Sequence, residues 1–139
     1  MSVVRGRAIV RGQAEGSVLL SARSISLWGG VDSVSGRIID RQHDRLGESV
    51  VGRVFAFPAE KGSSTGSAVL LELIRASRAP AAIVTQHLAP IVALGAIMAE
   101  ELYGKTIPIL VVSKADFDSL CDGERVCIDG GGEIRRIGE

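Results

Sequence analysis

Short apolar runs and longer helical patterns alternate along the second half of the chain. The strand-like runs are residues 53–57, 81–85 and 107–112, and the helical patterns are residues 67–76, 89–104 and 115–121. The runs at 81–85 and 107–112 are continuously apolar, as expected of strands buried on both faces of a sheet. Pro90 suits a first helical turn, and Gly104 suits the left-handed position after a helix. This half therefore predicts βαβ units around a parallel sheet.

The two ends of the chain have the pattern of hairpins. Apolar positions in residues 3–10 and 17–20 surround a turn at residues 12–16, which predicts a first hairpin. Residues 125–129 and 133–137 surround three consecutive glycines and predict a closing hairpin. The strand that ends at Phe57 is expected to begin near Glu48.

Residues 21–40 fit neither a long strand nor a long helix. This stretch contains Trp28, the only tryptophan, followed by Gly29 and Gly30. Ordered loops of this length are often functional. Burial preferences favour Trp28 as a packing anchor over a substrate platform.

The stretch from Phe57 to Ser67 joins a strand-like run to a helical pattern and is rich in glycine and hydroxyl groups. A strand, a flexible turn and a helix N-terminus direct free backbone N–H groups and a positive helix end toward one place, which suits an anion. Gly62 and Gly66 allow a ligand to approach the backbone closely. The simpler alternative is that the serines and Thr65 only cap the helix.

Composition narrows the possible functions. The 139 residues are 46% hydrophobic and 23% charged, and 16 basic residues balance 16 acidic ones. We therefore expect one globular domain, residues 1–139, with no electrostatic preference for nucleic acid or an anionic membrane. Two cysteines are too few for a disulfide framework or a metal cluster. No apolar run has membrane-spanning length, and the chain is expected to be cytoplasmic.

Single residues add little by themselves. His43 and His87 are expected at the surface, while Cys121 and Cys127 are interpreted as a helix-end residue and a small core residue. Neither a Walker-type phosphate loop nor a Cys-x-x-Cys pair occurs. The residues alone indicate an α/β domain with a turn able to bind an anion.

Four segments together resemble the small subunit of the aconitase X family. They are residues 26–32, 36–40, 61–64 and 79–83, in the same order and at similar spacing. The resemblance implies an α/β fold, the three-layer β/β/α swivelling domain of aconitases. It also implies a larger partner subunit that carries a [4Fe-4S] cluster, with no metal ligand in this chain. Archaeal two-subunit members are phosphomevalonate dehydratases, and bacterial relatives are cis-3-hydroxy-L-proline dehydratases.

The same resemblance implies roles for individual residues. Aconitase swivelling domains carry a catalytic serine in a Gly-Ser-Ser-Arg turn, and residues 62–64 match it with Thr65 in place of the arginine. Ser63 is then the base that removes a proton from carbon. The implied substrate-binding residues are Gly62, Ser64, Thr65, Gly29, Gly30 and Asp32. Without the arginine, Lys61, backbone N–H groups or the large subunit must bind the substrate anion.

The resemblance favours phosphomevalonate dehydratase, acting on a small phosphorylated hydroxy acid. A cis-3-hydroxy-L-proline dehydratase subunit and a non-catalytic phosphate-binding swivel module are alternatives. Phosphotransfer swivelling domains use a histidine, and residues 57–67 contain none. A purely structural partner that caps another subunit is a further possibility.

Overall fold

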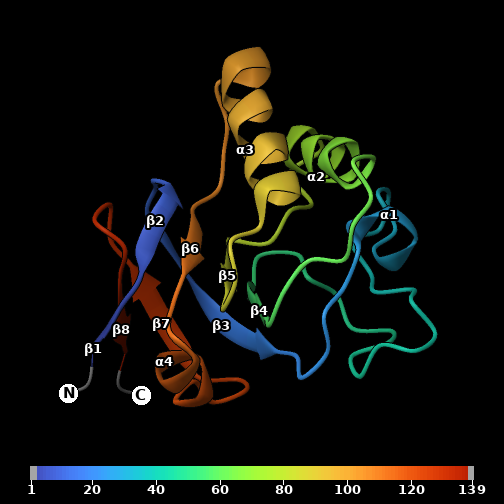
Figure 1. Cartoon of the computed structure of the whole chain (residues 1–139). Coiled ribbons are helices and arrows are strands. Elements are labelled where there is room, and N and C mark those ends of the chain that lie inside the picture. The colour runs from blue at the N-terminus through green and yellow to red at the C-terminus, as the bar shows by residue number, and fades with distance from the viewer. Residues whose placement is uncertain (1–2, 138–139) are drawn as a thin grey trace.

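The computed structural model describes residues 3–137 and contains a mixed sheet of eight strands within that range (Figure 1). In spatial order the strands are β1 (Val3–Arg5), β8 (Glu133–Arg136), β7 (Arg125–Ile128), β3 (Ala14–Leu20), β4 (Val54–Phe57), β5 (Ala82–Thr85), β6 (Ile109–Val111) and β2 (Arg7–Val10). The helices are α1 (Leu27–Gly30), α2 (Gly66–Arg75), α3 (Pro90–Tyr103) and α4 (Lys114–Asp118).

The middle of the sheet is parallel, as the alternating pattern predicts. β3, β4, β5 and β6 are parallel neighbours, with Leu19 opposite Phe55, Phe55 opposite Ile83, and Ile83 opposite Ile109. α2 connects β4 to β5 and α3 connects β5 to β6. Pro90 lies in the first turn of α3, and Gly104 ends the helix with φ 67°. Both helix boundaries predicted for this segment are confirmed.

The predicted first hairpin is wrong. β2 pairs antiparallel with β6, whereas β3 pairs with β4 on one side and β7 on the other. Val18 and Leu19 are fully buried, so β3 requires neighbours on both sides and on both faces. The predicted extension of β4 back to Glu48 is also wrong, because Gly52 turns the chain with φ 70° just before the strand. The closing hairpin of β7 and β8 is confirmed.

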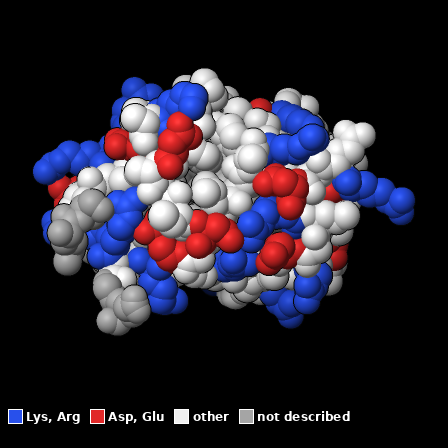
Figure 2. All heavy atoms as spheres, turned by 90° about the horizontal axis from the view of Figure 1, so that it is seen from below, with Lys and Arg blue, Asp and Glu red and all other residues white. Residues whose placement is uncertain are grey.

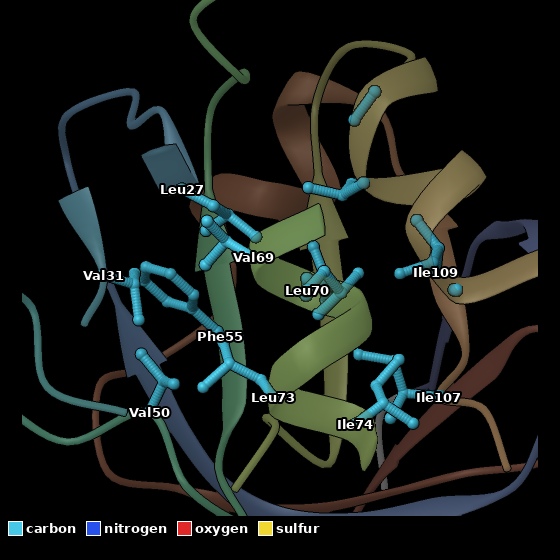
Figure 3. Close-up of a cluster of buried hydrophobic side chains, with 14 of the residues drawn as sticks. Leu27, Val31, Val50, Phe55, Val69, Leu70, Leu73, Ile74, Ile107 and Ile109 are labelled. Atoms are coloured by element: carbon cyan, nitrogen blue, oxygen red, sulfur yellow. The ribbon is translucent and has the colours of Figure 1, made fainter. Parts of the chain in front are cut away.

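Two hydrophobic cores lie on opposite faces of the parallel strands. In β4, Phe55 and Phe57 face the core under α2 and α3, part of which is drawn in Figure 3. Val54 and Ala56 face the second core, which also contains side chains of β7, β8 and α4. Successive strand residues point to opposite faces, so one strand serves both cores. The predicted β/β/α layering is confirmed.

The long segment after β3 packs along the start of α2. Leu27 and Val31 are buried in the same core as Val69 (Figure 3). α1 is a single irregular turn, since Trp28 and Gly29 have non-helical backbone angles. The Trp28 side chain is 59% exposed, so its predicted role as a packing anchor is wrong.

Candidate functional site

The turn between β4 and α2 is held at its base by two neighbouring segments. The backbone N–H of Lys61 donates to the Ile25 carbonyl at 3.0 Å, and that of Ile25 donates to Ala59 at 3.3 Å. The N–H groups of Gln86 and His87, in the loop after β5, both donate to the carbonyl of Pro58. The turn is therefore anchored on two sides before it reaches its glycine and serines.

Glu60 ties this turn to α3. Its carboxylate accepts hydrogen bonds from the backbone N–H groups of Ile91 at 2.9 Å and Val92 at 3.1 Å. The first N–H groups of a helix lack intrahelical acceptors and carry partial positive charge, so an acidic side chain is stabilising there. The N-terminus of α3 is thus occupied by the chain's own carboxylate.

The tip of the turn, residues 62–65, has unused hydrogen-bonding groups. Ser63 is half-buried, whereas Gly62, Ser64 and Thr65 are exposed. Among the described residues, no hydrogen-bond partner exists for the three hydroxyls or for the backbone N–H groups of residues 62–65. At the start of α2 the Gly66 N–H donates to the Ser63 carbonyl, so a backbone carbonyl takes the place of a side-chain cap. The capping interpretation is therefore wrong, and the groups suited to an anion remain available.

Lys61 is exposed directly before this tip, and His87 is exposed in the loop after β5. Lys61 has no ion-pair partner among residues 3–137, so its ammonium group is available to an anionic ligand. His87 was expected at the surface, and the structure agrees, but the hydrogen bond to Pro58 also places its backbone against the turn. The sequence signal for this proximity is its place just after a strand end, because the carboxyl ends of parallel strands meet at one edge of a sheet.

Gly29 and Gly30 lie in the segment that borders the start of α2. A Cβ on Gly66 would lie 3.8 Å from the backbone nitrogen of Trp28, which measures how closely this segment approaches the turn. Gly29 is exposed, with φ 77°, a left-handed conformation that favours glycine. Gly30 is buried, and a Cβ there would lie 2.7 Å from the Ile25 side chain.

Asp32 is engaged within its own loop. Its carboxylate accepts hydrogen bonds from the Ser35 hydroxyl and from the backbone N–H groups of Val34 and Ser35. The Ser35 hydroxyl is the main reason that the pKa of Asp32 lies below its ordinary value. The structure therefore brings Gly29 and Gly30 beside the turn and uses Asp32 to shape the loop that follows them.

Comparison with known proteins identifies the family. The aconitase X swivel domain matches residues 3–136. The chain belongs to the aconitase X family. The holo-form crystal structure of Thermococcus kodakaraensis aconitase X aligns with a TM-score of 0.89 and 36% identity, over 99% of this chain and 100% of that one.

The named relatives include two kinds of dehydratase. The chain is 39% identical to the phosphomevalonate dehydratase small subunit of Pyrococcus furiosus, over 98% of this chain and 96% of that protein. It is 48% identical to the cis-3-hydroxy-L-proline dehydratase of Pseudomonas aeruginosa over 82% of this chain. It covers only 20% of that enzyme and 21% of the corresponding one from Hypocrea jecorina, about a fifth of each.

Within this aconitase X swivel domain, Ser26 begins the first of the four segments that carry the resemblance, but no role was predicted for it. Its hydroxyl oxygen is buried and has no hydrogen-bond partner among the described residues. Its neighbour Ile25 forms a bridge with Glu60, so Ser26 lies alongside the base of the turn. Buried polar atoms are seldom unpaired, and each exception calls for an explanation. A serine before an apolar residue is too common a pattern to have revealed it.

His43 is buried, so its predicted surface position is wrong. Its Nε2 lies 2.7 Å from the Ser21 hydroxyl, which donates to Asp44 at 2.7 Å. The backbone N–H of Arg45 donates to Nδ1, so we assign the ring proton to Nε2. Nε2 then donates to Ser21 and cannot act as its base, as it would in a hydrolase triad. This cluster joins two loops, and its histidine does not activate the Ser21 hydroxyl.

No group of three or more histidine, cysteine or acidic side chains able to hold a metal ion occurs among residues 3–137. Cys121 and Cys127 are free thiols, which follow α4 and lie in β7, respectively. In the same range, no helix has the length and apolar character needed to cross a membrane.

Proposed function

We propose that this chain is the swivel subunit of an aconitase X-type dehydratase and that Ser63 is its catalytic base. The observation that carries the proposal is the tip of the turn. There, three hydroxyls and the adjacent N–H groups have no partner within the described residues, at the start of a ten-residue helix. The family relationship indicates dehydration as the class of reaction, and the geometry of the turn supports Ser63 as the base.

A serine hydroxyl must lose its proton before it can remove one from carbon. The positive end of α2 and the free N–H groups of residues 62–65 would stabilise the resulting alkoxide, as in an oxyanion-binding site. A partner that closes over the half-buried Ser63 would exclude water and strengthen these interactions. In this proposal Ser64 and Thr65 hold the substrate, and Gly62 lets it approach the backbone.

Lys61 supports an anionic substrate, since it is exposed beside the tip and has no ion-pair partner among the described residues. It can supply the positive charge that the arginine supplies in the related motif. We propose that Gly29 and Gly30 complete the surface that faces the substrate. Asp32 acts there indirectly, by fixing the loop through Ser35 and Val34.

The described residues do not fit a [4Fe-4S] cluster, because they contain no set of ligands for one. The proposal therefore places the cluster on a large subunit, whose existence the name "small subunit" of the archaeal relatives implies. Bound there, the cluster would supply Lewis-acid assistance to the departing hydroxyl. The work of this chain is to hold the substrate anion and to accept the proton at Ser63 Oγ. We also propose that residues 1–139 form one swivel domain. The protein is proposed to act in the cytoplasm.

Phosphomevalonate is the first substrate to test, because the archaeal relatives with that name match at about 40% identity over most of both chains. Cis-3-hydroxy-L-proline is the second, because the Pseudomonas relative has 48% identity. Lys61 favours a phosphorylated substrate, because a phosphate carries more negative charge than a carboxylate.

The experiment combines this chain with its cognate large subunit, purified without oxygen, and follows loss of each substrate. We expect the isolated chain to show neither iron–sulfur absorbance nor dehydratase activity, and the mixture to dehydrate one of the two substrates. Turnover by this chain alone would contradict the division of roles. If the complete complex acts on neither substrate, the proposed substrates are wrong.

A further inference from the structure

The outward side of α3 is apolar and exposed. Leu94 is 51% exposed and Ile97 47%, and further along the same side Leu102 is 61% exposed. Met98 lies between them and is also exposed. At spacings of three and four residues these four side chains form one stripe. We call Leu94, Ile97, Met98 and Leu102 the outer face of α3.

α3 is also apolar on its inward side. Val92, Ala96 and Ala99 are buried in the core, and Gly95 packs so closely on α2 that a Cβ would lie 2.7 Å from the Ser67 carbonyl oxygen. No charged residue occurs between Pro90 and Ala99. A helix that is apolar all round is normally covered all round. By contrast, the side of the molecule seen from below carries many interspersed acidic and basic residues (Figure 2).

The far end of the outer face carries uncompensated negative charge. Glu100 and Glu101 are exposed in the last turns of α3 and form no ion pair with the described residues. Acidic side chains near a helix C-terminus are unfavourable, because that end has partial negative charge. A partner that places basic side chains there would relieve the repulsion. The surface therefore fits an apolar partner patch with a basic edge.

We infer that the outer face of α3 is the docking surface for the large subunit. In the Pseudomonas relative the matching part is one fifth of a single longer chain, so there the domain is covalently joined to a much larger remainder. Glu60 joins the turn directly to the first residues of α3, so a subunit that closes over Ser63 is already beside this helix. The inference rests on the proposed function and names the surface through which the partner binds.

The test measures binding of Ile97→Lys to the cognate large subunit by titration calorimetry or a similar method. Its control is Ile137→Lys, which changes the same residue type at a position 39% exposed, beyond β8. Truncation or charge at the centre of an interface often costs a factor of roughly 30 or more in affinity. We expect that loss for Ile97→Lys, with an unchanged melting temperature of the free chain, and wild-type affinity for Ile137→Lys.

Three results would overturn the inference. They are wild-type affinity for Ile97→Lys, equal losses for both variants, and self-association of the free chain that Ile97→Lys abolishes while binding to the large subunit persists. Ser63→Ala measured in parallel keeps the two proposals apart. It is expected to bind like the wild type whether or not its activity is lost. A tight complex that depends on Ile97 but lacks dehydratase activity would support the docking surface and refute the proposed function.

Discussion

Glu60 accepts a hydrogen bond from the backbone N–H of Ile91, with 2.9 Å between the carboxylate oxygen and the nitrogen. Through this contact the residue two positions before Gly62 is fixed to the start of a different helix. The candidate catalytic turn is consequently positioned by α3 as well as by α2, the helix that follows it in the chain.

Glu60→Gln is expected to loosen this arrangement. The amide retains an acceptor but loses the charge that favours a helix N-terminus, so the free energy of unfolding should fall by about 1 kcal/mol. If Glu60 positions the turn, kcat of the reconstituted enzyme should fall and KM should change less. Thermal unfolding and steady-state kinetics provide the two readouts. Unchanged kcat with lowered stability would limit Glu60 to a structural role.

Ser63→Ala should remove activity without disturbing the fold. Its hydroxyl has no partner within the described residues, so we expect a stability change within about 0.5 kcal/mol. A positioned base contributes roughly 100- to 10,000-fold, and kcat should fall by such a factor with little change in KM. Ser64→Ala should mainly raise KM, and Thr65→Ala should be the mildest of the three. Normal kcat in Ser63→Ala would move the base to Ser64 or to the partner.

Gly62→Ala should lower activity without lowering stability, whereas Gly95→Ala should lower stability. A Cβ at Gly62 meets no atom within 4 Å, so the free chain should melt as the wild type does. Activity should nevertheless fall if the substrate approaches this backbone. At Gly95 a Cβ would meet the Ser67 carbonyl oxygen at 2.7 Å, and overpacking of this kind costs about 1–3 kcal/mol. A fully active Gly62→Ala enzyme would argue against close substrate approach there.

His43→Ala should destabilise the protein and spare its chemistry. The buried ring bonds Ser21 and the Arg45 N–H, so its loss should cost about 1–3 kcal/mol. Among chains that remain folded, kcat should match the wild type.

A fluorophosphonate probe should not label Ser21, because His43 donates to that hydroxyl. Labelling that disappears in His43→Ala would contradict the assigned ring proton.

Acid should weaken the fold through Asp44. Partial burial favours its protonated form, but hydrogen bonds from the Ala22 N–H and the Ser21 hydroxyl outweigh this, and the pKa of Asp44 lies below its ordinary value. A carboxyl whose pKa is lowered by folding stabilises the folded state at pH values above its ordinary pKa. This contribution disappears as the pH falls through the folded-state pKa. Melting temperatures between pH 6 and 2.5 should therefore fall more steeply in the wild type than in Asp44→Asn. Parallel curves would show that Asp44 does not contribute.

Local pattern was sufficient for the elements around the candidate site. The apolar run ending at Phe57, the Gly-Ser turn and the helix beginning at Gly66 depend on interactions between close neighbours in the chain. The same holds for Pro90 and Gly104 at the ends of α3, because ring geometry and left-handed φ are local properties.

Tertiary structure alone decided which distant groups meet. Alternation makes residues 7–10 and 14–20 strands, but it cannot specify that β2 pairs with β6 and β3 with β4 and β7. The burial of His43 and the hydrogen bond from the Ile91 N–H to Glu60 depend on partners about 20 to 30 residues away. Pairing of this kind is selected by the burial of both sheet faces together. A sequence pattern records only that a residue is apolar or polar, so it determined the elements while the packed sheet determined their neighbours.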